Sequence, residues 1–400
     1  MGDIDLTDVG LHADGDRVHE VFHHLREHEP LHWNAAHTEP GFWSVTRYDD
    51  CVRVQKDPAS FSSSPTNVLG PHRVHGDQGD GKMLNTTDAP RHDELRRLVN
   101  RQFTPRAVAR LEPYLRTVAG RALERALEAG ECDFAAVAAT LPVAGICALL
   151  GVPTKDWNLL LRLTRTAFGS FDGEYQCTGD VRGSAAQAHG RLLVYCGALL
   201  EERRRCPLDD LVSVLAGATD RGDLTNEEAL LFFDLLVLGG NETTRHGTVG
   251  GVLELGRRPD QWRLLAGDGG LVPRAVEEIL RWTSPSRHVI RRASRDVELH
   301  GRTIRAGDDV ALWHASANRD PRAFPDASRF AVDRTPNRHL AFGSGPHFCL
   351  GTALAALEIR VMLEELLARV ARVDVLAPPD RLRSTVIGGI KHLRVRLHAR

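Results

Sequence analysis

The chain has 400 residues, of which 42% are hydrophobic and 26% charged, and its formal net charge is -2. This size allows one large hydrophobic core, and the near-neutral charge argues against a general nucleic-acid-binding protein, which needs a basic excess. The seven cysteines are odd in number and include no C-x-x-C pair, so neither a disulfide framework nor a zinc site is expected. The acidic N-terminal segment, residues 1–30, contains no apolar run of signal or membrane-anchor length, which favours a soluble cytoplasmic protein.

Helical patterns dominate the chain. Asp88 is placed to cap a helix that has Pro90 in its first turn. Thr225 and Glu228 form a capping-box pattern, which predicts a helix over residues 226–258 that ends before a proline. At 1.5 Å per residue this helix is roughly 50 Å long, enough to cross a whole domain.

Strand signals are few and local. Residues 297–304 read as a hairpin with its turn at 300–301, residues 310–313 as a second strand region, and residues 393–397 alternate in polarity. No internal repeat or linker divides the chain. The sequence therefore predicts a mainly α fold with a minor β part, in a single domain that covers residues 1–400.

Cys349 lies between a glycine-containing approach and a long amphipathic run. Leu350, Leu354 and later apolar residues recur at helical spacing, so the thiol lies at a predicted helix N-terminus, where free N–H groups favour a thiolate. Gly343 and Gly345 allow tight turns and a close approach of the backbone to a flat partner. Two functions suit such a thiolate: a nucleophile with His347 as its base, or an axial ligand to iron. A buried structural cysteine explains neither the glycines nor the helix start.

The segment "FGSGPHFCLG" resembles the haem-binding signature of the cytochrome P450 monooxygenases, F-x-x-G-x-(basic)-x-C-x-G. The resemblance implies haem b as the cofactor, with Cys349 as the axial thiolate ligand to iron in a loop over residues 339–351, and electron donation from this sulfur favours O–O cleavage. It also implies a fold shaped as a triangular prism, with the long central helix lying over the haem. The signature and its loop bring these residues to the cofactor, with His347 at a propionate: Phe342, Gly343, Gly345, His347, Cys349 and Gly351.

Two further segments occur in the order that the family requires. Glu278 and Arg281 fit the E-x-x-R motif of the family's internal ion pair, although this spacing alone is a common surface pair. The segment "NRDPRAFPDASRF", residues 318–330, matches the stretch that precedes the haem loop, and Arg329 is the expected third partner of the ion pair. The family pattern runs from about Trp33 to the C-terminus.

The long helix contains "LGGNETTRHG", residues 238–247. Gly239 and Gly240 each cost about 1 kcal/mol in a helix interior relative to alanine, so close helix packing or a function should require them. The segment resembles the family's oxygen-activating A-G-x-(D/E)-T motif, with Gly240, Glu242 and Thr243 in the matching positions and Gly239 in place of the alanine. By resemblance Gly240 makes room for dioxygen, Thr243 holds a water at the oxygen site, and Glu242 connects that site to bulk protons.

Haem carboxylates need cationic partners. His92 and Arg96 project from one face of a helix at i,i+4, where the family places propionate contacts, although an exposed basic face gives the same pattern. Arg291 corresponds to another propionate arginine, with Arg292 as the alternative register.

By resemblance, two substrate-access loops, residues 64–84 and 166–181, border the pocket, and the second is a glycine-containing connection that acts as a mobile lid. Arg287 and His288 either favour a polar or anionic substrate or face solvent. Loops of this composition also occur without function. The expected pocket residues are Val68, Phe168, Phe171, Leu236, Gly239, Val289 and Ile387.

The resemblance implies a haem-thiolate monooxygenase of the soluble bacterial, actinomycete-like type. It would hydroxylate or epoxidise a small organic substrate, in secondary-metabolite or antibiotic-like biosynthesis, with O2 and electrons from NAD(P)H. Because no flavin or iron–sulfur segment is present, the electrons come from a ferredoxin and a ferredoxin reductase. An acidic ferredoxin would dock on four basic residues near the sulfur: Arg97, Arg101, Arg106 and Arg338. The alternative is that these arginines only pair with local acids such as Glu112.

Alternative functions remain open at this stage. The "GNETTR" variant resembles members that hydroxylate amino acids tethered to an acyl or peptidyl carrier protein, and the same fold also performs oxidative coupling. A haem sensor without turnover has no need for the Glu242–Thr243 pair. No nucleic-acid or membrane partner is expected, and the protein is expected to be a monomer.

Overall fold

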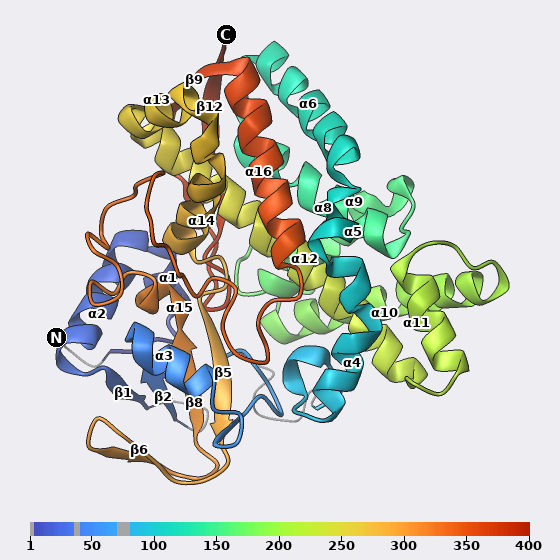
Figure 1. The fold of residues 1–400 in the computed structure, drawn as a ribbon, viewed down its shortest axis with the longest axis vertical. Coiled ribbons are helices and arrows are strands. Elements are labelled where there is room, and N and C mark those ends of the chain that lie inside the picture. Colours follow the sequence, from blue (N-terminus) through green and yellow to red (C-terminus); the bar gives the residue numbers. More distant parts are fainter. Residues whose placement is uncertain (1–3, 36–40, 70–80) are drawn as a thin grey trace.

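The computed structural model describes residues 4–35, 41–69 and 81–400. Helices make up most of this structure, and the strands gather mainly at one corner (Figure 1). The predicted mainly α, single-domain fold with a minor β part is confirmed. The α-helices are α1 Val9–Ala13, α2 Gly15–His28, α3 Tyr48–Gln55, α4 Arg91–Val99, α5 Pro105–Ala109, α6 Glu112–Ala129, α7 Phe134–Ala138, α8 Thr140–Leu150, α9 Trp157–Phe168, α10 Val181–Arg205, α11 Leu211–Asp220, α12 Asn226–Arg257, α13 Pro259–Gly267, α14 Val272–Thr283, α15 His314–Ala317 and α16 Thr352–Arg369.

The largest sheet has the strand order β1-β2-β8-β5-β3, in which β2 and β8 run parallel and the other neighbours antiparallel. A second sheet has the antiparallel order β4-β12-β9, and two hairpins complete the β part. The strands are β1 Leu31–Asn34, β2 Phe42–Val45, β3 Phe61–Ser62, β4 Glu131–Asp133, β5 His288–Ala293, β6 Val297–Leu299, β7 Arg302–Ile304, β8 Asp309–Trp313, β9 Val370–Val375, β10 Asp380–Arg381, β11 Ile390–His392 and β12 Arg394–Ala399.

The helix expected over residues 226–258 is α12, Asn226–Arg257. Its capping box forms as the sequence indicates: the Glu228 backbone N–H donates to the Thr225 hydroxyl at 3.1 Å, and the Thr225 N–H donates to the Glu228 carboxylate at 2.8 Å. The helix lies between two hydrophobic clusters, one with α6, α14 and α16 and the other with α9, α10 and α11. Because it is buried on nearly all sides, α12 has no single apolar stripe.

Two local predictions have different outcomes. The hairpin β6–β7 turns at His300 and Gly301, which have φ angles of 50° and 70°, as a tight two-residue turn requires. The cap predicted at Asp88 is wrong, because its carboxylate accepts hydrogen bonds from the Ser62 hydroxyl and, at 2.9 Å, from the Ser63 N–H. Donors on β3 and the residue after it therefore take the side chain that the helix start could have used, and α4 begins without a side-chain cap.

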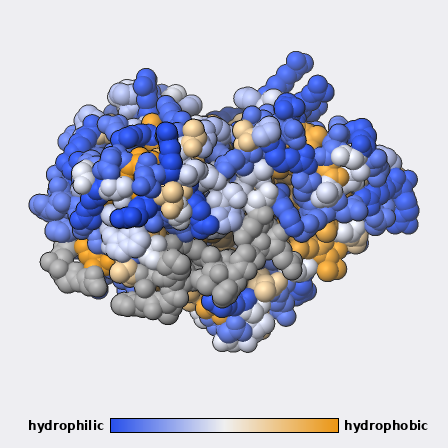
Figure 2. All heavy atoms as spheres, turned by 90° about the horizontal axis from the view of Figure 1, so that it is seen from below, coloured by the Kyte–Doolittle hydropathy of each residue, from blue (hydrophilic) through white to orange (hydrophobic). Residues whose placement is uncertain are grey.

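The face in Figure 2 is largely hydrophilic, with small separate hydrophobic areas. Among the helices of the described residues, none has the length and apolar character needed to cross a membrane.

Candidate active site

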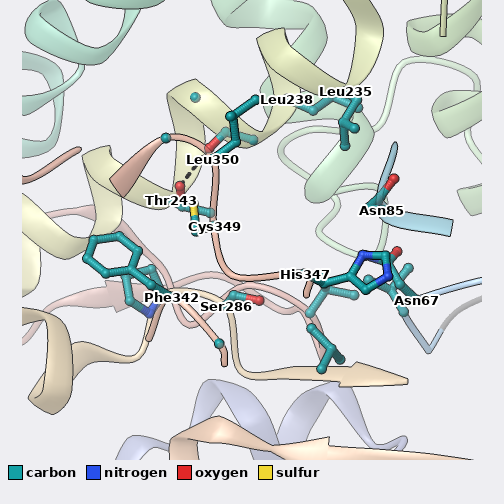
Figure 3. A pocket seen from close by; sticks show the side chains of 18 of the residues that line it. Asn67, Asn85, Leu235, Leu238, Thr243, Ser286, Phe342, His347, Cys349 and Leu350 are labelled. Atoms are coloured by element: carbon teal, nitrogen blue, oxygen red, sulfur yellow. Dashed lines mark hydrogen bonds between the residues drawn. The ribbon is translucent and has the colours of Figure 1, made fainter. Parts of the chain in front are cut away.

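A cavity of about 460 Å³ lies beneath the middle of α12. Cys349, Phe342 and His347 reach it from the loop before α16, and Thr243 reaches it from α12 (Figure 3). Its walls are predominantly apolar. All seven expected pocket residues line it: Val68, Phe168, Phe171, Leu236, Gly239, Val289 and Ile387.

The Cys349 loop is shaped by its glycines. Gly343 and Gly345 have φ angles of 70° and 72°, and a Cβ at Gly345 would lie 2.4 Å from the backbone oxygen of Gln55. No other residue fits there without moving α3, so glycine is required. The Cys349 N–H donates to the Phe342 carbonyl at 2.9 Å, which closes the loop, and the helix after it begins at Thr352.

The thiol of Cys349 sits just before the helix start rather than within it. Burial raises the pKa of Cys349, while the Gly351 N–H, the Thr352 hydroxyl and the charge of Arg96 oppose this increase. The nearby donors therefore favour the thiolate, but their effect on the pKa is smaller than that of burial. A cation bound to the sulfur would outweigh the effect of burial. No hydrogen bond joins His347 to Cys349, and the His347 ring instead packs against His92 with the centroids 4.2 Å apart. This arrangement does not support a cysteine nucleophile with His347 as its base.

Basic residues gather at one end of the cavity. His92, Arg96, Arg291 and His347 all line it. Burial, followed by the charges of Arg291, His92 and Arg96, lowers the pKa of His347 to about 3. The Nε2 atom of His92 is buried and has no partner in the described part of the chain. The two arginines, together with the unused buried nitrogen of His92, form a place for carboxylates that enter with a ligand.

The structure of β5 shows which of Arg291 and Arg292 reaches the cavity. Arg291 lies on the cavity side, whereas Arg292 pairs with Asp309 at 2.9 Å on the other face. Adjacent residues of a strand point to opposite faces, so only one of the two arginines can reach the cavity. Arg291 is the one that does.

On α12, Gly239, Gly240 and Thr243 form the wall above the sulfur. A Cβ at Gly240 would lie 3.0 Å from the Ile146 side chain on α8, so close helix packing contributes to the choice of glycine here. A Cβ at Gly239 would meet no atom within 4 Å, so this glycine leaves space open. The Thr243 hydroxyl donates to the Gly239 carbonyl at 2.8 Å.

Glu242 does not line the cavity. It is 1% exposed and forms an ion pair with Arg245 at 2.5 Å, with His246 at 3.3 Å. Burial raises the pKa of Glu242, but Arg245 and His246 outweigh this effect and hold it at about 2. Because successive residues of a helix are about 100° apart, Glu242 faces Thr164 of α9 when Thr243 faces the cavity. Its role in proton supply stays a prediction.

One acidic residue on the cavity wall was missed in the sequence. Glu358 of α16 is 1% exposed, and burial raises its pKa well above the ordinary value, with the Thr244 hydroxyl opposing this only in part. Burial therefore disfavours the charged form of this carboxyl group. A signal existed, because Glu358 follows Leu354 by four residues and lies on the apolar stripe of its helix.

The expected internal ion pair forms, but with a different third partner. Arg281 Nε lies 2.7 Å from Glu278 Oε2, and both side chains are fully buried. Arg334, not Arg329, completes the cluster, with its Nε 3.0 Å from the same oxygen. The Arg329 side chain is exposed, and only its carbonyl takes part, accepting from Arg281 and Arg334. The prediction of Arg329 is wrong because the chain turns between residues 325 and 334, so that the side chain of Arg334, and not that of Arg329, reaches Glu278.

The expected access loops are partly described. Residues 169–180 connect α9 to α10, as predicted, and Asp172 in this connection is buried and bonded to Lys391 at 3.1 Å. Residues 70–80 of the other loop lie outside the described residues. Arg287 and His288 do not line the cavity: Arg287 donates to the His12 carbonyl, and His288 bonds Leu69 and Thr385. Neither residue therefore selects for an anionic substrate.

Comparisons with known proteins agree with this geometry. The cytochrome P450 family model matches residues 270–375. A putative cytochrome P450 126 from Mycobacterium tuberculosis is 42% identical over 99% of this chain and 98% of its own length. The crystal structure of P450 OxyD, which is involved in the biosynthesis of vancomycin-type antibiotics, has a TM-score of 0.90 and 38% identity, and covers 99% of this chain and 100% of its own. The structure of P450BioI with a fatty-acid-ligated acyl carrier protein has a TM-score of 0.86 and 28% identity, and covers 96% and 98%.

The chain belongs to the cytochrome P450 family. It is an oxidoreductase that binds haem b, with Cys349 as the axial thiolate ligand. The observed residues fit this cofactor: the sulfur faces an apolar cavity, glycines allow close approach, and the cationic end with its unpartnered His92 nitrogen suits the two propionates. When bound, haem b supplies the iron at which dioxygen is activated.

Proposed function

We propose that this cytochrome P450 hydroxylates or epoxidises a small organic substrate of secondary metabolism, of the antibiotic-like kind. One observation carries the proposal: Cys349 and Thr243 face a single cavity whose remaining wall is mainly apolar. An apolar wall selects a substrate by shape and burial, and leaves one part of it near the reactive centre. Gly239 adds space at this position, because no atom approaches its open side.

The protein's own residues have distinct parts in this reaction. Phe342, Gly343 and Gly351 shape the loop that presents the sulfur, while His92, Arg96, Arg291 and His347 would hold the propionates. The Thr243 hydroxyl can turn from the Gly239 carbonyl and hold a proton or a water in the cavity. Gly240 keeps the helix backbone close to that point. Glu242, fixed by Arg245, supplies a buried negative charge behind the helix and is the proposed end of the proton route.

Electrons come from NAD(P)H through a ferredoxin reductase and an acidic ferredoxin. Phe348, beside the sulfur loop, is 41% exposed. The alternative that the arginines near it pair with Glu112 is not supported, because Glu112 bonds Arg116 and Arg360 instead. No ion pair between described residues uses any of the four exposed arginines: Arg97, Arg101, Arg106 and Arg338.

The docking face is tested by stopped-flow reduction of the substrate-bound protein. The rate should fall as salt rises, since the Debye length is about 8 Å at physiological ionic strength. Arg101→Glu and Arg106→Glu should slow reduction further, whereas Arg263→Glu on α13 should not. A rate that is indifferent to salt and to both variants would place the docking face elsewhere.

The activity is tested by incubating candidate substrates with a generic ferredoxin, its reductase, NAD(P)H and 18O-labelled dioxygen. A product that gains one labelled oxygen atom supports monooxygenation. A product formed by loss of two hydrogens without labelled oxygen would indicate oxidative coupling. Ligand binding with no product and no NAD(P)H oxidation across the panel would favour a sensor.

A carrier-tethered substrate is the second candidate. Arg162 on α9 and Arg182 and Arg191 on α10 are exposed on the two helices that the 169–180 connection joins, and P450BioI was solved with an acyl carrier protein. Carrier proteins are acidic, so such a face suits them. Comparing turnover of the same amino acid or acyl group, free and carrier-bound, separates the two candidates.

A further inference from the structure

A group of buried and half-buried basic side chains lies outside the active site, where the N-terminal helices meet the large sheet. Figure 1 shows α1, α2 and α15 together in this region. Arg26 belongs to α2, Arg287 precedes β5, Arg319 follows α15 and Arg381 ends β10, and His19 of α2 lies among them. Three of the arginines come from segments that meet at α15: Arg26 bonds Ser316, the Ala315 N–H donates to the Arg287 carbonyl at 3.1 Å, and the Arg319 N–H donates to the Ser316 carbonyl at 2.9 Å. Burial lowers the pKa of His19 well below its ordinary value, and the charges of Arg319, Arg287, Arg26 and Arg381 lower it further.

The hydrogen bonds of these arginines are incomplete. Arg26 donates to the Ser316 carbonyl at 3.1 Å and hydroxyl at 2.8 Å, Arg287 to the His12 carbonyl at 2.7 Å, and Arg319 to the Trp282 carbonyl at 3.2 Å. All of these acceptors are neutral. Four buried nitrogens of these side chains have no partner in the described part of the chain: the Nε atoms of Arg26, Arg287 and Arg319, and Nδ1 of His19. Buried donors are nearly always satisfied in native proteins, so these nitrogens require an acceptor that the described residues do not supply.

The region also lacks a counter-charge. Within the described residues, no carboxylate lies at ion-pair distance from any of the four arginines, and the nearby Asp320 and Glu278 bond to other groups. Burial lowers the pKa of Arg287 to about 9 and that of Arg26 to about 10. An uncompensated buried charge costs several kcal/mol, so a set of them requires compensation.

Three buried arginines outside this cluster are each paired with a carboxylate. Arg203 pairs with Asp210 at 2.5 Å, Arg245 with Glu242 at 2.5 Å, and Arg281 with Glu278 at 2.7 Å. Arg291 is also buried without a carboxylate partner, but it lines the cavity, where a haem propionate is its expected counter-charge. The cluster around His19 has no such partner. The start of α2 adds further positive potential, because the Arg381 guanidinium carbon lies 2.8 Å from where a Cβ of Gly15 would be. Asp14 and Asp16 partly compensate the positive charge of Arg381, but not that of the other three arginines.

We propose that a small inorganic anion of the halide class, with chloride as its physiological member, is bound among Arg26, Arg287, Arg319 and His19. The three Nε–H groups and the Nδ1–H of a neutral His19 supply four donors, and the anion supplies both the missing acceptor and the missing charge. The ion ties the N-terminal helices to the strand that follows Ser286, which lines the substrate cavity. Its role is structural, and it is independent of the proposed substrate.

The site is tested on the haem-loaded full-length protein with bromide as the probe. Crystals soaked in sodium bromide should give an anomalous peak at the bromine edge between the Nε atoms of Arg26, Arg287 and Arg319. In solution, thermal unfolding is followed in sodium chloride and in sodium gluconate at equal ionic strength. Chloride should stabilise, with the unfolding equilibrium constant falling about tenfold for each tenfold rise in chloride above its Kd.

Variants connect the two measurements. Arg287→Met should abolish the chloride-specific stabilisation, while Arg203→Met, which removes a buried arginine with its own carboxylate, should lower the melting temperature but keep the chloride dependence. Should Arg287→Met fail to fold, the bromide map of the native protein decides. Waters in place of a bromine peak would overturn the proposal. A peak without chloride-dependent stability would show an adventitious ion only, and chloride dependence that persists in Arg287→Met would place the ion elsewhere; both also overturn it.

Discussion

Replacing Arg334 with methionine should destabilise the protein far more than the same change at Arg329. The Arg334 side chain is 8% exposed, and its Nε lies 3.0 Å from Glu278, which is fully buried. Its other nitrogens donate to the carbonyl groups of Pro325 at 2.5 Å, Asp326 at 3.0 Å and Arg329 at 2.7 Å. These bonds fix the turns that lead to the cysteine loop. The Arg329 side chain makes no comparable contact.

The magnitude follows from what remains after the change. Removing one partner of a buried ion pair costs about 3–5 kcal/mol, and Glu278 retains Arg281, so the lower end, about 3 kcal/mol, applies to Arg334→Met. Unfolding entropy of about 2.1 cal/mol/K per residue gives roughly 0.8 kcal/mol/K for this chain, so the melting temperature should fall by about 4 °C. Arg329→Met, an exposed change, should stay within about 0.5 kcal/mol.

The assay is thermal unfolding of both haem-loaded variants at one scan rate, followed by far-ultraviolet circular dichroism and by the haem Soret band. Arg334→Met should also lose haem at a lower temperature, since the turns that it fixes precede the ligand loop. Equal decreases in the two variants, or a larger decrease in Arg329→Met, would refute the assignment of Arg334 to the cluster.

Three further predictions concern the site and its surroundings. Cys349→Ser should lose the red-shifted Soret band of the ferrous–CO complex, whereas Cys147→Ser, a change at a buried cysteine outside the cavity, should keep it; an unchanged Cys349→Ser spectrum would remove Cys349 as the ligand. Thr243→Ala should keep the CO spectrum and oxidise NAD(P)H, but yield at least about tenfold less product and release hydrogen peroxide instead. Thr248→Ala is the matched control, because the Thr248 hydroxyl donates to the Thr244 carbonyl at 2.8 Å, the same kind of bond, but away from the cavity. If both variants form the same amount of product per NAD(P)H consumed, the result contradicts a proton role for Thr243. The third prediction concerns pH: the Asp133 and Glu174 carboxylates raise the pKa of His392 above its ordinary 6.5, so the stability that this contact contributes is complete below pH 6.5 and is lost as pH rises through the raised value. The side chain is 46% exposed, so His392→Gln should cost only about 0.5 kcal/mol at pH 6 and almost nothing at pH 9, and a difference that does not change with pH would show that the histidine charge is not involved.

Features that depend on neighbouring residues could be predicted from the sequence. The capping box at Thr225 and Glu228, the turn at His300 and Gly301, and the glycine-shaped loop around Cys349 each form from a few consecutive side chains and backbone angles. Local sequence therefore predicted them, and the order of the motifs predicted the fold and the haem-thiolate class. The pocket residues followed from the same alignment of motifs.

Which of several nearby side chains makes a given contact could not be predicted, because it depends on how distant segments pack. Asp88 bonds β3 rather than its own helix, Arg334 replaces Arg329 beside Glu278, and Glu242 turns from the cavity toward Arg245. Each outcome depends on groups far away in the chain, whose distances no local pattern contains. The same holds for the arginines around His19, which come from four separate segments, because burial and charge are properties of the packed molecule and not of the residues in a row.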